Sequence, residues 1–307
     1  MKKISVTFIL VIQFMGCINV GSIGKPIITL LAKKGQISTV FSSQAGGERS
    51  FYVSLPDSYS KATKYKLVLV FPGTSTTGLE MKTFVGDGWN GIKGLEANMP
   101  NTIFVYPDPK WRYFPVWKTT DGGWLLGPFA GAAKGMEDIY FISELLDWIK
   151  NNYTIDSERI FATGHSWGGD MTAVVGCFLG DKFRAIAPVA ANRPYWFESG
   201  SKPLNPVGNP SVWTFFGTDD DHFRGQEPNN GDFGREQNQF WMDKYTCDAK
   251  FLKLNIEPKG ESVEYKNCTN TVRFTLYSPN FSGNSDQPGH QPPDFYLSEV
   301  PIWFNSF

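Results

Sequence analysis

Runs of consecutive apolar residues recur along the chain, and such runs are typical of strands buried on both faces of a sheet. They are Lys66–Phe71, Thr102–Tyr106, Arg159–Thr163, Ala185–Val189 and Val212–Phe216. Two earlier segments alternate between apolar and polar residues in the manner of antiparallel strands, namely Gln36–Ser42 and Ser50–Leu55. Ser262–Lys266 and Val272–Tyr277 predict two further strands near the C-terminus.

Helical spacing separates several of these strands. Met136–Asn152 places apolar residues along one face of a helix, and further helices are expected over Gly168–Leu179, Gly234–Lys244 and Tyr296–Phe307. Strands that alternate with helices predict a single α/β domain with a mostly parallel central sheet flanked by helices. The Gly-, Pro- and Trp-rich segments 73–101 and 108–134 are expected to be long loops with short helices, and they could overhang a site.

The N-terminus has the pattern of a secretory signal. Two lysines, Lys2 and Lys3, precede the apolar stretch Ile4–Met15, which is short for a membrane span. We therefore expect a signal peptide over residues 1–22, a domain over 23–307, and a secreted, extracellular protein without a membrane anchor. A net charge of -1 over 307 residues gives no electrostatic basis for binding nucleic acid.

Of the four cysteines, Cys247 and Cys268 lie together in the C-terminal region and could pair. Such a bridge would close a loop of about 20 residues and stabilise the fold by about 3 kcal/mol in the chain-entropy model. Cys177 occupies an apolar position in the helix expected over Gly168–Leu179, which favours a buried free thiol.

The pentapeptide Gly164-His165-Ser166-Trp167-Gly168 directly follows the strand expected over Arg159–Thr163. A strand that runs into Gly-x-Ser-x-Gly and then a helix predicts a nucleophile elbow, in which Ser166 stands above the sheet. Glycines fill the flanking positions because the turn is too tight for side chains. A serine needs a base within hydrogen-bond reach, and that base needs an orienting carboxylate.

The base must be one of three histidines. His165 is beside Ser166, but its side chain is expected to point away across the turn, and His222 lies in the loop that would supply the acid. His290 follows the last strand and completes the order serine, acid, histidine that is expected of an α/β-hydrolase. The acid is expected in the loop after Val212–Phe216, where the residues alone leave three choices: Asp219, Asp220 and Asp221.

The negative charge that develops on the attacked carbonyl oxygen needs two backbone N–H donors. Trp167, the residue after the nucleophile, is expected to supply one donor. Thr74, in the loop that follows Lys66–Phe71, is expected to supply the other. Loss of one such donor typically lowers the rate on the order of a hundred- to a thousandfold.

From about Gly46 to the C-terminus, the chain resembles the secreted esterases of the feruloyl esterase and polyhydroxybutyrate depolymerase group, carbohydrate esterase family 1. The matching motifs are Val70–Thr74, Val105–Asp108, Asp138–Ile142, Tyr153–Asp156 leading into Arg159–Gly169, Phe183–Val189, Gly217–Asp220, Gly289-His290 and Ile302–Phe304. The resemblance implies an α/β-hydrolase fold. Its Gly-Thr-x-Asp motif selects Asp220 as the acid. Pro72, Thr74 and Thr154 depart from the family, which often has His, Cys and Cys at these places, but backbone donors do not need those side chains.

The resemblance implies a serine esterase that acts on plant cell-wall polysaccharide such as arabinoxylan, with a feruloyl esterase as the leading hypothesis. Trp124, Trp167 and Phe223 are the expected walls for an aromatic acyl group, although ordinary packing could explain each ring. No cofactor or metal is expected, and the chain is expected to be monomeric. The alternatives are an acetylxylan esterase or polyhydroxybutyrate depolymerase with the same triad, and a non-catalytic carbohydrate-binding protein on a hydrolase scaffold.

Overall fold

The computed structural model describes residues 32–115, 117–126, 135–194, 198–199, 202–203, 205–220, 231–256 and 260–307. The signal peptide expected over residues 1–22 lies outside this part of the chain. Among the described residues, no helix has both the length and the apolar character that a membrane crossing requires.

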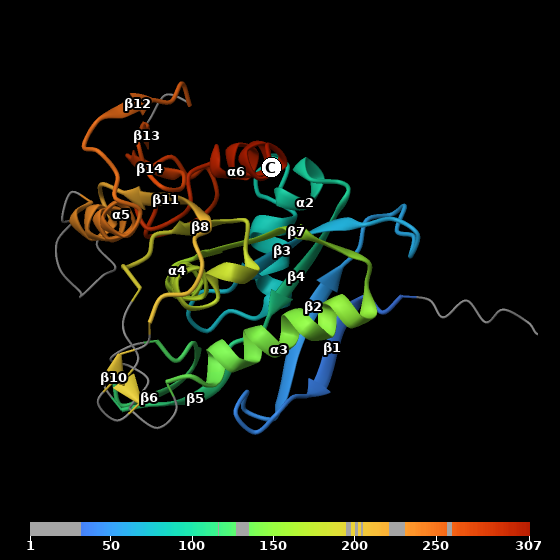
Figure 1. Cartoon of the computed structure of the whole chain (residues 1–307). Helices are drawn as coiled ribbons and strands as arrows, with labels where there is room; N and C mark the ends of the chain where they lie inside the picture. Colours follow the sequence, from blue (N-terminus) through green and yellow to red (C-terminus); the bar gives the residue numbers. More distant parts are fainter. Residues whose placement is uncertain are drawn as a thin grey trace, which may run out of the picture. The chain divides into compact units, whose positions relative to one another are not determined.

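A ten-stranded sheet forms the centre of the fold (Figure 1), in the order β1-β2-β4-β3-β7-β8-β11-β14-β13-β12. The run from β4 to β14 is parallel, whereas the strands outside it pair antiparallel. This confirms the mostly parallel sheet. The strands are β1 Gly35–Val40, β2 Glu48–Ser54, β3 Tyr65–Phe71, β4 Thr102–Pro107, β7 Ile155–His165, β8 Ala185–Val189, β11 Ser211–Gly217, β12 Phe251–Lys253, β13 Gly260–Tyr265 and β14 Val272–Tyr277.

Helices cover both faces of the sheet, which explains the continuous apolar runs. In β3, Leu67 and Leu69 enter one core while Val68 and Val70 enter the other, because successive side chains of a strand point to opposite faces. The first core includes side chains of α3 (Glu137–Asn152), α4 (Trp167–Phe178) and α5 (Asp232–Lys244). The second includes those of α1 (Gly78–Met81), η1 (Lys82–Gly86), α2 (Leu95–Asn98) and α6 (Tyr296–Asn305).

The segment after β4 differs from the expectation. Instead of a loop with short helices, residues 110–123 form an antiparallel hairpin of β5 (Lys110–Phe114) and β6 (Thr119–Gly123). Trp111 and Tyr113 are exposed while Phe114 is buried. Each strand has only five residues, and few of their side chains are apolar and face the main core. The alternation of apolar and polar residues was therefore too short to predict a strand. The expectation of short helices over 73–101 is confirmed by α1, η1 and α2.

The expected disulfide between Cys247 and Cys268 is confirmed. It links the turn after α5 to the turn between β13 and β14. Cys177 is a buried free cysteine, as expected, and burial raises the pKa of its thiol to about 12. The thiolate is therefore not populated at neutral pH, which gives Cys177 a packing role.

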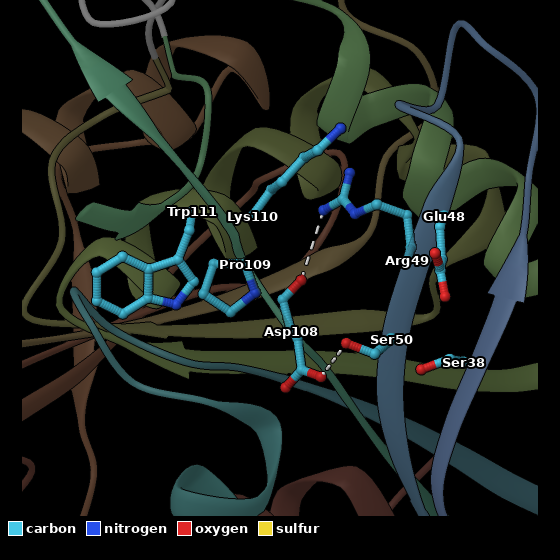
Figure 2. Close-up of a pocket in the computed structure, with 8 residues that line it drawn as sticks. All are labelled: Ser38, Glu48, Arg49, Ser50, Asp108, Pro109, Lys110 and Trp111. Atoms are coloured by element: carbon cyan, nitrogen blue, oxygen red, sulfur yellow. Dashed lines mark hydrogen bonds between the residues drawn. The ribbon is translucent and has the colours of Figure 1, made fainter. Parts of the chain in front are cut away.

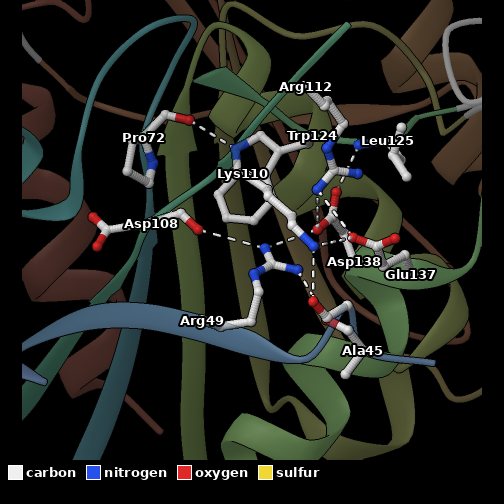
Figure 3. A network of polar contacts seen from close by, with 11 residues as sticks. Ala45, Arg49, Pro72, Asp108, Lys110, Arg112, Trp124, Leu125, Glu137 and Asp138 are labelled. Carbon is white, nitrogen blue, oxygen red and sulfur yellow. Dashed lines mark hydrogen bonds and ion pairs between the residues drawn. The ribbon is translucent and has the colours of Figure 1, made fainter. Parts of the chain in front are cut away.

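A buried ion-pair network anchors the β5–β6 hairpin to the body of the domain (Figure 3). At its centre Asp138, the second residue of α3, lies 2.8 Å from Nη2 of Arg49 and 3.3 Å from Nη2 of Arg112. The other carboxylate oxygen accepts the backbone N–H of Leu125 at 2.7 Å. Arg49 comes from β2 and Arg112 from β5, so one carboxylate connects a strand of the sheet, a helix and the hairpin.

Candidate active site

Ser166 occupies a strained turn between β7 and α4. Its backbone angles are φ 60° and ψ -128°, a conformation that L-residues rarely adopt and that is characteristic of a nucleophile elbow. A methyl group built on Gly164 would lie 2.4 Å from the carbonyl oxygen of Gly168, and one built on Gly168 would lie 1.9 Å from that of Phe71. The two flanking positions therefore have no room for side chains, as the sequence argument required.

Three residues that are far apart in the sequence form a hydrogen-bonded chain. Oγ of Ser166 lies 2.9 Å from Nε2 of His290, and Nδ1 of His290 lies 2.9 Å and 3.0 Å from the carboxylate oxygens of Asp220. All three are buried, with exposed fractions of 8%, 4% and 1%. Because a carboxylate accepts, Nδ1 of the imidazole donates to Asp220 and Nε2 is left to accept the serine hydroxyl proton.

Two glycines allow the loops that carry the acid and the base to touch. A methyl group built on Gly217 would lie 2.1 Å from the carbonyl oxygen of Gly289, and one built on Gly289 would lie 2.3 Å from that of Asp219. This close backbone contact places the segments after β11 and β14 side by side. It explains why glycine precedes both the aspartate loop and His290.

The structure distinguishes between two of the three neighbouring aspartates. Asp220 faces His290, whereas Asp219 is exposed and its carboxylate accepts the hydroxyl of Thr218 at 2.9 Å. Asp221 lies outside the described residues, as do His222 and Phe223. Among the described residues, no three His, Cys, Asp or Glu side chains are grouped so that they could hold a metal ion.

The loop after β3 lies against the nucleophile. A methyl group built on Gly73 would lie 3.4 Å from Cβ of Ser166 and 3.9 Å from its Oγ, so the next backbone N–H, that of Thr74, starts beside the serine. Trp167 is the first residue of α4, where helical N–H groups have no partner within the helix. These two positions remain our proposed donors to an oxyanion.

Trp124 is buried in the protein and does not line an accessible site, in contrast to the expectation. Its side chain has no exposed surface, and its indole N–H donates to the carbonyl oxygen of Pro72 at 2.9 Å (Figure 3). Its ring also packs edge-on against Phe71, with 5.6 Å between the ring centroids. The expectation that Trp124 walls the substrate is therefore corrected, because a fully buried ring supports the loop that begins at Pro72 and is not available to a ligand.

Trp167 lies in a group of aromatic rings at the elbow. Its ring centroid is 4.9 Å from that of Phe114 and 4.8 Å from that of Trp117. A methyl group built on Gly123 would lie 2.5 Å from the Trp167 ring, so the hairpin packs directly onto it. Trp117 is 44% exposed and was missed by the sequence reasoning, where its place in a Trp-rich segment was the only available signal.

His165 contacts the backbone of the residue proposed as the base. We expected its side chain to point away from Ser166 across the turn. In the structure its Nε2 lies 2.7 Å from the carbonyl oxygen of His290. A carbonyl oxygen can only accept, so Nε2 of His165 donates this hydrogen bond. The bond ties the His290 loop to the end of the strand that precedes Ser166.

Asp170 is a second buried carboxyl group near the elbow, in the first turn of α4. Its Oδ1 accepts the backbone N–H of Asn192 at 2.6 Å. Burial raises the pKa of Asp170 to about 7, and the negative charge of Asp220 adds to this, while the hydrogen bonds from Asn192 act in the opposite direction. Asp170 therefore changes its charge near neutral pH.

Residues 42–250 match the model of a protein family described as "Putative esterase". The chain belongs to this esterase family. It is a carboxylic ester hydrolase. The esterase is 26% identical over 235 residues to a probable feruloyl esterase C of Aspergillus clavatus, a match that covers 75% of this chain and 74% of the relative. It is 22% identical over 267 residues to feruloyl esterase D of Neurospora crassa, with 83% and 81% covered.

Solved structures with the same fold include an acetyl xylan esterase from Aspergillus awamori, at a TM-score of 0.63 and 14% identity, covering 88% of this chain and 99% of that one. A thermostable esterase matches with a TM-score of 0.55 and 15% identity, over 88% and 62% of the two chains. At these identities the likeness establishes the fold alone, which is that of an α/β-hydrolase.

Proposed function

We propose that this esterase hydrolyses feruloyl and related hydroxycinnamoyl esters on plant cell-wall polysaccharide such as arabinoxylan. The observation that carries the proposal is the 2.9 Å contact of Ser166 Oγ with His290, whose other ring nitrogen contacts Asp220. The proposal for the acyl group is supported by two relatives, from Aspergillus clavatus and Neurospora crassa, that carry the name feruloyl esterase. The 15% aromatic content adds rings that suit a phenolic acyl group.

The proposed reaction is acyl transfer through Ser166. His290 takes the hydroxyl proton through Nε2 as Oγ attacks the ester carbonyl carbon, while Asp220 holds the imidazole in the required tautomer and stabilises its charge. The backbone N–H groups of Thr74 and Trp167 would stabilise the oxyanion. His290 then gives the proton to the leaving sugar alcohol, and an acyl-enzyme remains. A water molecule, deprotonated by His290, attacks the acyl-enzyme, which releases the carboxylic acid and restores Ser166.

For the acyl group, we propose a position against Trp167 and Trp117. Both rings lie at the elbow, and Trp117 is the more exposed of the two. Contact with an aromatic ring contributes about 0.5–1.5 kcal/mol beyond the buried area, which favours a phenolic over a small aliphatic acyl group. Phe223 stays a proposal on the basis of its sequence position.

The proposed location is extracellular. Support comes from the charged and apolar pattern of the first 22 residues, which we propose to be a signal peptide followed by a single esterase domain over 23–307. The disulfide between Cys247 and Cys268 fits an oxidising compartment. The proposed partner is a feruloylated polysaccharide or oligosaccharide, and the proposed active form is a monomer.

Release of ferulate from methyl ferulate, measured beside release of acetate from 4-nitrophenyl acetate, tests the proposal. Ser166→Ala is expected to lower kcat on the order of 10⁶-fold and Asp220→Ala on the order of 10⁴-fold, as in other serine hydrolases. Asp219→Ala is the matched control and is expected to change kcat little, because its carboxylate faces Thr218.

The outcomes separate the alternatives. Ferulate release that is lost in Ser166→Ala supports the proposed function. Acetate release alone would move the assignment to an acetyl esterase, and equal losses in Asp219→Ala and Asp220→Ala would overturn the choice of acid. Release of neither acid would require a test on polyhydroxybutyrate and on sugar binding without hydrolysis.

A further inference from the structure

A groove lies between the strands β1 and β2 and the start of the β5–β6 hairpin (Figure 2). It has a volume of about 280 Å³. Six of its eight lining residues have polar or charged side chains, and a large aromatic ring lies at one end. The lining residues that matter here are Ser38, Glu48, Ser50, Asp108, Lys110 and Trp111.

The aromatic end of the groove belongs to an exposed face of the hairpin. Trp111 is 62% exposed and Tyr113 is 58% exposed, and their spacing along β5 places both on the same face. The residue opposite Trp111 in the register is Gly122, and a methyl group built there would lie 3.3 Å from the indole. Glycine at this position lets the ring lie over the hairpin and leaves the rest of the ring open to solvent.

Some polar side chains of the groove are held by hydrogen bonds within the protein, and others are accessible to a ligand. The carboxylate of Asp108 accepts hydrogen bonds from Oγ of Ser50 at 2.5 Å and from the backbone N–H of Gly78 at 2.6 Å. In contrast, the exposed side chains of Ser38 and Glu48 make no hydrogen bond to any residue that the structure describes. A rigid carboxylate beside available acceptors and a hydroxyl can bind a ligand rich in hydroxyl groups, since each hydroxyl both donates and accepts.

The Trp111 end of the groove lies close to the loop that carries the proposed oxyanion donor. A methyl group built on Gly122 would lie 3.3 Å from the Trp111 indole and also 3.5 Å from Cα of Ser75. The backbone N–H of Ser75 donates to the carbonyl oxygen of Gly122 at 2.8 Å, and Ser75 directly follows the proposed oxyanion donor Thr74. A polymer whose ester is held at Ser166 can therefore continue across this loop onto Trp111.

We propose that this groove, together with the rings of Trp111 and Tyr113, binds sugar residues of the polysaccharide that carries the ester. The inference rests on the proposed function and deepens it, because it assigns a binding site to the sugar chain as well as to the acyl group. An aromatic ring flanked by carboxylate and hydroxyl groups matches the apolar ring face and the polar edge of a sugar.

Binding of a xylo-oligosaccharide without ester groups, measured by isothermal titration calorimetry, tests the groove directly. The protein carries Ser166→Ala so that no hydrolysis can contribute. Adding Trp111→Ala is expected to weaken binding about two- to tenfold, the effect of one lost aromatic contact. Adding Phe251→Ala is the matched control, because Phe251 is also an exposed aromatic residue but lies on β12, at the opposite edge of the sheet from β1.

Glu48→Gln provides a second variant on an exposed side chain that forms no hydrogen bond within the described structure, and it is expected to weaken binding without loss of folding. The proposal is overturned if the oligosaccharide does not bind, or if Trp111→Ala and Glu48→Gln both bind it as well as Phe251→Ala does. Sedimentation velocity of the same variants covers the competing explanation. A dimer that dissociates in Trp111→Ala, with sugar binding unchanged, would assign the aromatic face to a second copy of the chain and overturn the proposal.

A kinetic ratio separates this inference from the proposed function. In the protein with Ser166, the kcat/KM on feruloylated arabinoxylan divided by that on methyl ferulate is expected to fall about two- to tenfold in Trp111→Ala and to stay constant in Phe251→Ala. Absence of activity on methyl ferulate in the wild-type protein would overturn the proposed function alone, because the binding assay still decides the groove.

Discussion

Replacement of Asp138 by asparagine is expected to destabilise the fold strongly while leaving the shape of the side chain unchanged. Asp138 has no exposed surface, and the side chain of Arg49, 2.8 Å away, is 2% exposed. The substitution removes the carboxylate that forms the ion pair with Arg49. The asparagine NH₂ group would also have to face either a guanidinium group or the N–H of Leu125, so that two donors would oppose each other.

Removing one partner of a buried ion pair costs about 3–5 kcal/mol, because the remaining charge stays out of water. The lost hydrogen bond to the Leu125 N–H alone accounts for about 1–3 kcal/mol of this value. For a domain of this size, each kcal/mol corresponds to roughly 2–4 °C in Tm, so we expect Tm to fall by roughly 6–20 °C. Guanidinium denaturation at pH 7 measures the free energy of unfolding, and calorimetry measures Tm.

The matched control is Asp156→Asn, which breaks the pair between Asp156 and Arg159 at a similar distance of 2.7 Å. This pair is largely at the surface, with the Arg159 side chain 38% exposed, and such pairs contribute about 0–1 kcal/mol. A free energy of unfolding of Asp138→Asn within 1 kcal/mol of the wild-type value would refute the reasoning. It would mean that burial does not make the loss of one partner more costly than at the surface. Equal losses in both variants would point to a general charge effect instead.

The pH dependence of the free energy of unfolding gives an independent test of this ion pair. Burial alone would raise the pKa of Asp138, but the nearby Arg49 and Arg112 and the N–H of Leu125 outweigh it and hold the pKa below its usual value. A carboxyl group with a lowered pKa stabilises the fold above its unfolded pKa of about 4, and this contribution is lost as the pH falls through the folded value. The stability difference between wild type and Asp138→Asn is therefore expected to be full at pH 7 and to shrink below pH 4.

Two further variants test the surroundings of the elbow. Burial raises the pKa of Asp170 to about 7, so its ionisation lowers the stability of the fold as the pH rises from 4 to 7. Asp170→Asn should therefore increase the free energy of unfolding by up to about 4 kcal/mol at pH 8 and by progressively less towards pH 5. Equal increases at both pH values would contradict this. His165→Leu removes the donor to the His290 carbonyl and should lower kcat on methyl ferulate up to about 100-fold at nearly constant KM, whereas His165→Gln should retain most of the rate. Identical kinetics of the two variants would exclude a positioning role.

The parallel part of the sheet was predictable from the sequence because both faces of its strands are buried, each in a different hydrophobic core. A strand such as β3, with Leu69 in one core and Val70 in the other, must be apolar at nearly every position, and this leaves a clear pattern. The edge strand β12 left none, since all three of its residues are exposed.

The candidate triad was also predictable, because each member follows a strand and lies within three residues of a glycine that the backbone requires. Gly164, Gly217 and Gly289 lie where a methyl group would collide with another backbone segment. The role of His165 left no such signal. Its hydrogen bond to His290 joins residues 125 positions apart, and only the assembled fold brings them together.

The part of the site that decides the substrate was the least predictable. Trp111, Trp117 and Trp124 lie in one segment of similar composition, yet Trp124 is fully buried, Trp117 packs edge-on against Trp167, and Trp111 is 62% exposed at the groove. The pairing of β5 with β6 places the Trp111 ring over Gly122, whereas Trp117 lies in the turn between the two strands and Trp124 follows β6. Composition indicates that rings are present, whereas the place of each ring in the folded hairpin, on a strand, in the turn or beyond β6, determines which of them a substrate can reach.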